Sequence, residues 1–92
     1  MNIKHLVIIV HGKVQGVYFR AATKAVANLL GVKGMVKNQA DGTVYMEAEG
    51  SEIDLDNFID WCQEGPDDAV VEKVDIHAGE LKNYRNFEIV KK

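Results

Sequence analysis

The sequence predicts an α+β fold in which two helices cover one face of a four- to five-stranded antiparallel sheet. Five short stretches have the apolar runs or alternation typical of strands, and two longer stretches have helical spacing. Glycine and proline turn signals separate these stretches. The 92 residues, of which 47% are hydrophobic, suit a single domain over residues 1–92 without a linker or low-complexity segment.

The first half of the chain predicts a strand, a turn and a helix. Residues 3–11 form a β-branched apolar run typical of a central strand. A turn bounded by glycines follows, and the next segment has the period of a helix that ends at Gly31. The residues expected on the buried face of this helix are Phe19, Ala22, Val26, Leu29 and Leu30.

A β-hairpin is predicted next. Two strand-like runs, residues 32–38 and 43–50, flank Asp41-Gly42, which is a strong hairpin turn signal. In the second run the apolar residues Val44, Met46 and Ala48 alternate with Thr43, Tyr45, Glu47 and Glu49. This alternation predicts one apolar and one polar face.

A second helix and further strands complete the pattern. Ser51 followed three residues later by Asp54 resembles a capping box, and Gly65-Pro66 ends the helix. Its apolar stripe consists of Leu55, Phe58, Ile59 and Cys62. Strands are expected within 70–77 and 86–90, with a loop over 78–86. The order β-α-β-β-α-β, with a short C-terminal piece that could belong to the last strand, matches the ferredoxin-like arrangement.

Composition argues against several classes of partner. The net charge is −3, and residues 52–68 hold seven acidic side chains and no Lys or Arg. Nucleic acids and membrane surfaces both require clustered basic charge, so neither is expected as a partner. The acidic run is best explained as a solvated helix face, and an acidic docking surface is the less favoured alternative. No stretch is long enough to span a bilayer or form a signal peptide.

The single cysteine, Cys62, excludes an internal disulfide and any multi-cysteine metal site. It fits a cytoplasmic location, where thiols stay reduced. Its place on the apolar stripe favours a core role, and its acidic surroundings argue against a catalytic thiol. The three histidines do not have the spacing of metal ligands.

The turn after the first strand has the parts of an anion site. Gly12 and Gly16 bound it, a helix N-terminus follows, and Arg20 lies in the first turn of that helix. Unpaired amides at a helix start carry partial positive charge, and a glycine with positive φ lets them converge. One ion pair at about 4 Å is worth about 4 kcal/mol at an effective dielectric near 20. Composition alone nevertheless favours a plain chain turn with a surface arginine.

Two motifs resemble those of the acylphosphatase family. The run from Val10 to Arg20, VHGKVQGVYFR, is similar to the family's signature loop. The run GMVKN at 34–38, followed by DGTV at 41–44 and Gly50, is similar to its second signature. The resemblance extends over the whole chain. One departure is Met35, where the family usually has an aromatic residue, and this affects the expected packing rather than the assignment.

The resemblance implies hydrolysis of acyl phosphates to a carboxylate and inorganic phosphate, with no metal, no cofactor and no covalent intermediate. By position, Arg20 would bind the phosphoryl group and Asn38 would position the attacking water. The backbone amides implied to cradle the phosphate are those of Gln15, Gly16, Val17, Tyr18 and Phe19. The implied partners are a small acyl phosphate and inorganic phosphate or another anion in the loop, and a monomer is the expected state.

Other functions on the same fold class receive less support. An RNA-recognition module would have a basic, aromatic-rich third strand, whereas residues 43–50 are acidic with one Tyr. A copper chaperone would need two cysteines close together. The main alternative is a binding or regulatory module that keeps the phosphate loop without turnover.

Overall fold

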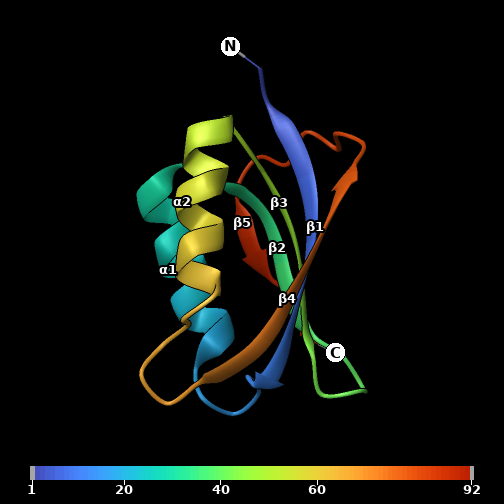
Figure 1. Ribbon diagram of the computed structural model, residues 1–92. Helices are drawn as coiled ribbons and strands as arrows, with labels where there is room; N and C mark the ends of the chain where they lie inside the picture. Colours follow the sequence, from blue (N-terminus) through green and yellow to red (C-terminus); the bar gives the residue numbers. More distant parts are fainter. Residues whose placement is uncertain (1, 92) are drawn as a thin grey trace.

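The computed structural model describes residues 2–91, which form two layers, with both helices on one face of the sheet (Figure 1). In chain order the elements are β1 (Lys4–Lys13), α1 (Phe19–Leu30), β2 (Lys33–Asn38), β3 (Val44–Gly50), α2 (Glu52–Cys62), β4 (Val70–Gly79) and β5 (Phe87–Ile89). The predicted α+β class is thereby confirmed. None of the helices in this part of the chain has the length and apolarity needed to cross a membrane.

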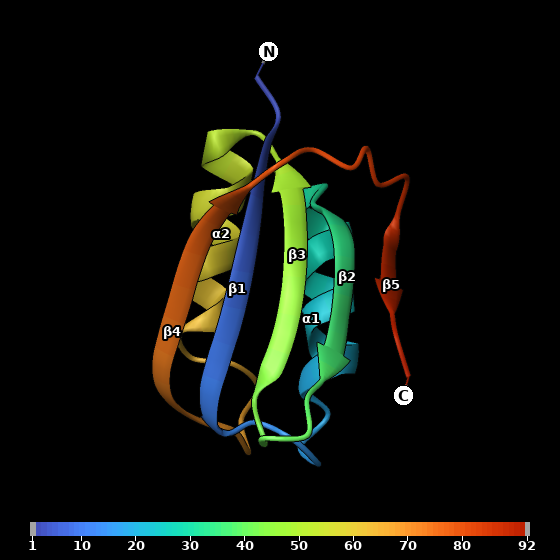
Figure 2. The same ribbon diagram turned by 90° about the vertical axis from the view of Figure 1, so that its right-hand side faces the viewer.

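The sheet is mixed and its strand order is β4-β1-β3-β2-β5 (Figure 2). Strands β1 to β4 pair in antiparallel fashion, but β5 pairs with β2 in parallel. The expectation of a wholly antiparallel sheet was therefore wrong. The C-terminal piece does not belong to β4, which extends to Gly79; it forms a separate strand at the opposite edge.

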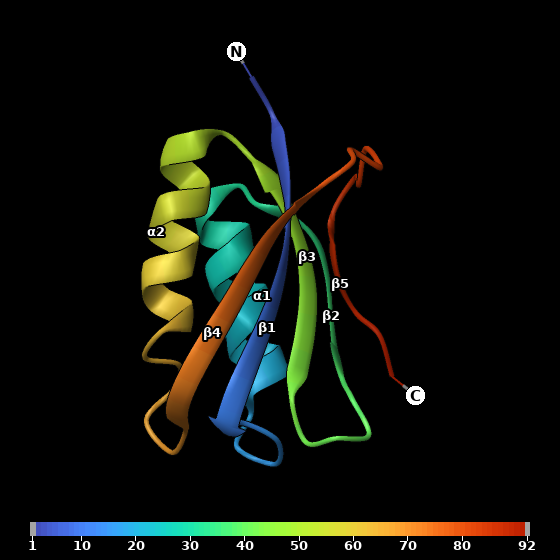
Figure 3. The ribbon, with the colours of Figure 1, turned by 45° about the vertical axis from the view of Figure 1, so that its right-hand side comes forward.

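The connection between β4 and β5 explains why β5 lies at the opposite edge of the sheet and runs parallel to β2. Residues 80–86 cross the sheet face that the helices leave open, and the chain then returns along the free edge of β2 (Figure 3). Gly34 N donates to Asn86 O at 3.0 Å, and Val90 N donates to Val36 O at 2.8 Å. This parallel pairing places the end of the chain beside the C-terminal end of β2.

Helix α1 packs its core face differently from the prediction. Its buried residues are Phe19, Thr23 and Ala27, whereas Leu29 is 84% exposed. The predicted stripe was therefore wrong at Leu29. A polar residue takes part in the core because the Thr23 hydroxyl donates to the Phe19 carbonyl at 2.7 Å, so no buried polar group is left unpaired there.

Helix α2 follows its prediction closely. The Ser51 hydroxyl accepts a hydrogen bond from the Asp54 amide at 3.2 Å and caps the helix. Leu55, Phe58 and Cys62 are buried against the sheet. With α1, this helix covers the apolar face of β3, where Val44, Met46 and Ala48 have no exposed surface.

The polar face of β3 is also covered. Glu47 and Glu49 are only 6% and 3% exposed, because the 80–86 connection lies over them. Backbone amides and side chains of that connection hydrogen bond to both carboxylates. The sheet face opposite the helices therefore carries a cluster of buried polar side chains and not a solvated surface.

Candidate active site

The loop from 14 to 18 joins the end of β1 to the start of α1. Val14 and Val17 are 1% and 7% exposed, so the loop is anchored in the core from within. Between these anchors the backbone turns sharply, with positive φ of 74° at Gly16 and 61° at Tyr18. Tyr18 is the N-cap of α1. A left-handed conformation is uncommon for a tyrosine, and such backbone outliers concentrate at functional sites.

The N-terminus of α1 is electrostatically uncompensated. Within residues 2–91 no side chain caps this helix, and its first turn holds no acidic residue. The first amides of a helix lack intrahelical partners and carry partial positive charge. Amides in this state are suited to bind an anion.

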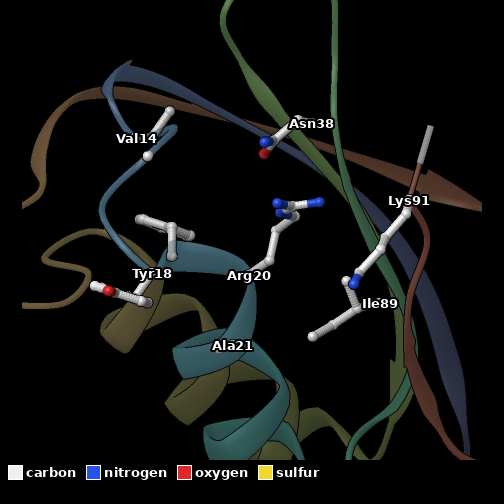
Figure 4. A pocket seen from close by; sticks show the side chains of 9 residues that line it. Val14, Tyr18, Arg20, Ala21, Asn38, Ile89 and Lys91 are labelled. Atoms are coloured by element: carbon white, nitrogen blue, oxygen red, sulfur yellow. The ribbon is translucent and has the colours of Figure 1, made fainter.

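Arg20 adds a full positive charge at the same place. It lies in the first turn of α1 and is half-buried, and its guanidinium points into the pocket (Figure 4). Among the described residues it has no acidic partner within salt-bridge distance. Its planar donor fork is therefore free to bind phosphate oxygens.

Asn38 is the last residue of β2, and its side chain faces the guanidinium of Arg20 across the pocket (Figure 4). Its Oδ1 is buried and has no hydrogen-bond partner in the part of the chain that the structure describes. Leaving a buried polar atom unpaired is costly, and most such atoms in proteins have partners. The unpaired oxygen is thus available to a bound water or ligand.

These groups line one pocket of about 500 Å³. Its lining residues are Val14, Gly16, Tyr18, Phe19, Arg20, Ala21, Asn38, Ile89 and Lys91. The set brings together Gly16, Tyr18, Phe19, Arg20 and Asn38 from the predicted site. Ile89 and Lys91 were missed, because only the parallel pairing of β5 with β2 carries the end of the chain to this pocket.

Two members of the predicted cradle do not line the pocket with their side chains. Val17 is buried in the core. The Gln15 side chain reaches the β2–β3 turn, where it donates to the carbonyls of Gln39 at 2.8 Å and Thr43 at 2.9 Å. The role predicted for these residues concerns their backbone amides and stays a prediction.

Other candidates lie away from the pocket. His11 pairs with Asp75 on β4 at 2.9 Å and thereby lowers the pKa of that carboxyl. Burial raises the pKa of the Cys62 thiol to about 12, which suits a core residue and not a nucleophile. Met35 and Val36 are adjacent on β2, so their side chains point to opposite faces of the sheet. Met35 is not among the described residues that line the pocket. The departure at Met35 therefore lies outside the pocket lining.

The pocket contains two different kinds of binding group. The uncompensated helix start and Arg20 can bind and neutralise an oxyanion. The carboxamide of Asn38 can hold a neutral polar molecule such as water, because an amide both donates and accepts hydrogen bonds. In the described range, no group of three or more His, Cys, Asp or Glu side chains lies close enough together to hold a metal ion.

Comparison with known proteins gives the family. The Acylphosphatase family model matches residues 6–89. A curated acylphosphatase from Archaeoglobus fulgidus is 48% identical over 84 residues, which cover 91% of this chain and 94% of the relative. The crystal structure of an acylphosphatase from Bacillus subtilis superposes with a TM-score of 0.92 at 33% identity, covering 97% of this chain and 99% of the other.

A much larger protein contains a similar unit. Full-length HypF, solved in a phosphate- and nucleotide-bound form, matches with a TM-score of 0.88 at 33% identity, over 98% of this chain but only 12% of HypF. The family match and the free-standing relatives agree along nearly the whole sequence. This chain belongs to the acylphosphatase family.

Proposed function

We propose that this protein is an acylphosphatase, which hydrolyses the carboxyl–phosphate bond of acyl phosphates. Arg20 and the backbone amides of residues 15–19 hold the phosphoryl group. Asn38 positions the water that attacks the phosphorus atom. The observation that carries the proposal is that one pocket contains both the Arg20 guanidinium and the buried Asn38 Oδ1, and that within residues 2–91 the first has no ion-pair partner and the second no hydrogen-bond partner.

The reaction needs few catalytic groups. The water oxygen forms a bond to phosphorus while the bond between phosphorus and the carboxylate oxygen breaks. The electron pair leaves with the carboxylate, whose conjugate acid has a pKa of about 4. Such a leaving group departs without a proton, so a general acid is not needed.

The demand on the nucleophile is also modest. Phosphoryl transfer passes through a loose transition state with little bonding to the attacking oxygen. A water held at the right place therefore reacts without a strong base, and its proton passes to the phosphate product or to solvent. Positioning and charge stabilisation remain, and Arg20, the loop amides and Asn38 supply both.

The same reasoning predicts the substrate class. Alkyl phosphate monoesters release an alkoxide, which requires protonation, and the pocket lining of the described chain holds no Asp, Glu, His or Cys side chain that could serve as a general acid near neutral pH. We therefore expect selectivity for the mixed anhydride. All the proposed groups come from one chain, so a monomer suffices for activity. The free thiol of Cys62 suits the cytoplasm, where thiols stay reduced.

The test is phosphate release from benzoyl phosphate in EDTA, with a phosphate monoester as the control substrate. Arg20→Ala should lower the rate by about 10²- to 10³-fold. Arg85→Ala is the matched control, because Arg85 is exposed on the 80–86 connection and should leave the rate unchanged. Turnover that needs added metal, or that survives in Arg20→Ala, would contradict the proposal.

The second candidate is a phosphate-binding module without turnover. A similar unit forms a small part of full-length HypF, a protein solved in a phosphate- and nucleotide-bound form, and this occurrence within a larger protein supports the second candidate. A folded wild-type protein that binds phosphate but leaves benzoyl phosphate intact would favour it.

A further inference from the structure

The Gln15 side chain bridges two parts of the site that are far apart in sequence. It belongs to the 14–18 loop, yet its amide nitrogen donates to Gln39 O at 2.8 Å and to Thr43 O at 2.9 Å. A primary amide has two N–H donors, and both are used here. Among residues 2–91, Gln15 is the one loop residue whose side chain hydrogen bonds to the β2–β3 turn.

The turn that receives these bonds is already stiff. Asp41 Oδ1 accepts from the Thr43 amide at 3.0 Å and from its hydroxyl at 2.6 Å. Gln39 N donates to Thr43 O at 2.9 Å, and Gly42 N donates to Gln39 O at 3.1 Å. A turn cross-linked in this way moves as a unit, so bonds to its two ends fix the position of the whole turn.

Asn38 immediately precedes this turn, and its own side chain does little to fix its place. Its buried Oδ1 has no partner in the described structure, so its position follows the backbone. That backbone is held by the pairing of Asn38 with Val44 and by the turn. The sheet places this end of β2, since Val44 also pairs with Val10 on β1. The bonds from Gln15 to Gln39 and Thr43 then hold the turn, and with it Asn38, against the loop.

The loop, by contrast, is held without Gln15. Val14, Val17 and Phe19 are at most 7% exposed and pin it to the core on both sides. Its turn geometry comes from the positive φ of Gly16 and Tyr18. Loss of the Gln15 amide should therefore leave the phosphate-binding groups in place.

From these contacts we propose that the Gln15 side chain is a positioning residue that sets the spacing between the phosphate site and Asn38. The inference rests on the proposed function, because the spacing matters only if Asn38 orients the attacking water. Its effect falls on the chemical step: displacing a reacting group by about 1 Å can cost about 10²-fold in rate. Phosphate binding depends on Arg20 and the loop amides and is not affected.

The test compares Gln15→Leu with wild type for kcat on benzoyl phosphate and for the inhibition constant of inorganic phosphate. Leucine keeps most of the side-chain volume but donates no hydrogen bond. We expect kcat to fall about 10- to 100-fold, while phosphate inhibition stays within about threefold of wild type. Gln15→Glu keeps the side-chain length and places an acceptor against two carbonyls, so its kcat should fall at least as far.

Ser51→Ala is the control for a general loss of stability. It removes one capping bond from α2, outside the pocket, and should lower the melting temperature without changing kcat. Wild-type kcat in Gln15→Leu would overturn the inference, and so would phosphate affinity that falls in step with kcat. An inactive wild-type protein, or an unchanged rate in Asn38→Ala, would overturn the proposed function first and the inference with it.

Discussion

His5 and Glu49 face each other across β1 and β3, with the imidazole Nδ1 2.7 Å from Glu49 Oε2. Their side chains are only 2% and 3% exposed. The same carboxylate accepts hydrogen bonds from the backbone amides of Lys82 at 2.6 Å and Tyr84 at 3.0 Å. This pair therefore anchors the connection that carries the chain from β4 across the sheet to β5.

Glu47 lies beside this pair, and its surroundings favour the carboxylate form over the protonated form. Burial acts to raise its pKa, but hydrogen bonds from Lys82, Tyr45 and Tyr84 outweigh burial and hold the pKa at about 2. Its carboxylate accepts from the two tyrosine hydroxyls at 2.7 Å each and lies 2.8 Å from the Lys82 ammonium. The folded structure therefore stabilises the carboxylate form of Glu47.

The first prediction follows from this lowered pKa. Because the folded value of about 2 lies below the ordinary value of 4.5, Glu47 stabilises the fold fully above pH 4.5, and this stability is lost as the pH falls toward 2. Urea unfolding across that range should show the free energy of unfolding falling with pH. Glu47→Gln should flatten the fall, whereas Glu88→Gln, at an exposed position on β5, should not. If the free energy of unfolding fell equally with pH in Glu47→Gln and in wild type, this role would be contradicted.

The buried pair gives a second prediction. Glu49→Ala leaves the His5 ring and the amides of Lys82 and Tyr84 without their acceptor. Leaving a buried hydrogen-bond donor unsatisfied typically costs about 1 to 3 kcal/mol, and the substitution removes the acceptor of three donors, so a loss of about 3 kcal/mol or more is expected. Chemical denaturation at neutral pH measures this loss, and Glu88→Ala serves as the exposed control, expected within about 0.5 kcal/mol of wild type. A small effect at Glu49 would mean that water replaces the carboxylate and that the connection needs no such anchor.

Asn38 gives a prediction in which activity and stability separate. Asn38→Ala should lower kcat by about 10²- to 10³-fold, since it removes the group that positions water. Phosphate inhibition should be nearly unchanged, because the phosphate is held elsewhere. The variant also removes a buried, unpartnered oxygen, so the free energy of unfolding should stay level or rise by about 1 kcal/mol. Parallel loss of kcat, phosphate affinity and stability would instead indicate a structural role.

Local signals in the sequence predicted much of the fold. Gly31 adopts a positive φ of 80° at the end of α1, and Asp41-Gly42 forms the hairpin turn, as expected from neighbouring residues alone. The position of β5 was not predictable in this way. It depends on a parallel pairing of three residues with β2, made only after the chain has crossed the sheet.

The errors within α1 have a related cause. Its sequence is rich in alanine, so the hydrophobic period alone did not fix which face the helix buries. Leu29 is large and apolar yet exposed, while the polar Thr23 is fully buried with its hydroxyl satisfied by the Phe19 carbonyl. That internal hydrogen bond satisfies the hydroxyl and so allows Thr23 to face the core, and the pattern of residue types does not show it.

The residues predicted for the candidate site rest on a different kind of signal. The composition of the turn favours a plain chain turn over an anion site, and the resemblance to the acylphosphatase family points instead to Arg20 and Asn38. The structure adds what no local pattern contains, namely the pocket that joins them and the contribution of Ile89 and Lys91. Ile89 is the last residue of β5 and Lys91 lies just beyond it, so the unpredicted pairing of this strand with β2 explains both the error in the sheet and the omission at the site.

The two glycines before α1 should respond differently to substitution. At Gly12, with φ of 127°, a Cβ would overlap the Val70 carbonyl oxygen where β1 bulges against β4. Gly12→Ala should therefore disrupt this pairing and cost several kcal/mol of stability, on the order of the largest single-substitution effects. At Gly16, with φ of 74°, a Cβ meets nothing within 4 Å, so alanine should cost about 1 kcal/mol through backbone strain alone.

Melting curves and phosphate titration separate these two effects. Gly16→Ala should remain folded at room temperature but bind phosphate more weakly, because strain at this residue displaces the amides that converge on the anion. Equal destabilisation by the two substitutions would contradict the difference in packing. Wild-type phosphate affinity in Gly16→Ala would show that the loop amides tolerate a shift in this turn.

Cys62 allows opening of the core to be measured directly. Its side chain is fully buried on α2, with Sγ 3.7 Å from the Met46 sulfur, and burial raises its pKa to about 12. Since thiol reagents attack the thiolate, labelling of the native protein should be slow and should accelerate with denaturant as the core opens. Asn57→Cys in a Cys62→Ala background places a thiol on the exposed face of the same helix and should react at once. If native Cys62 reacted as fast as this control, α2 would be separating from the sheet without global unfolding.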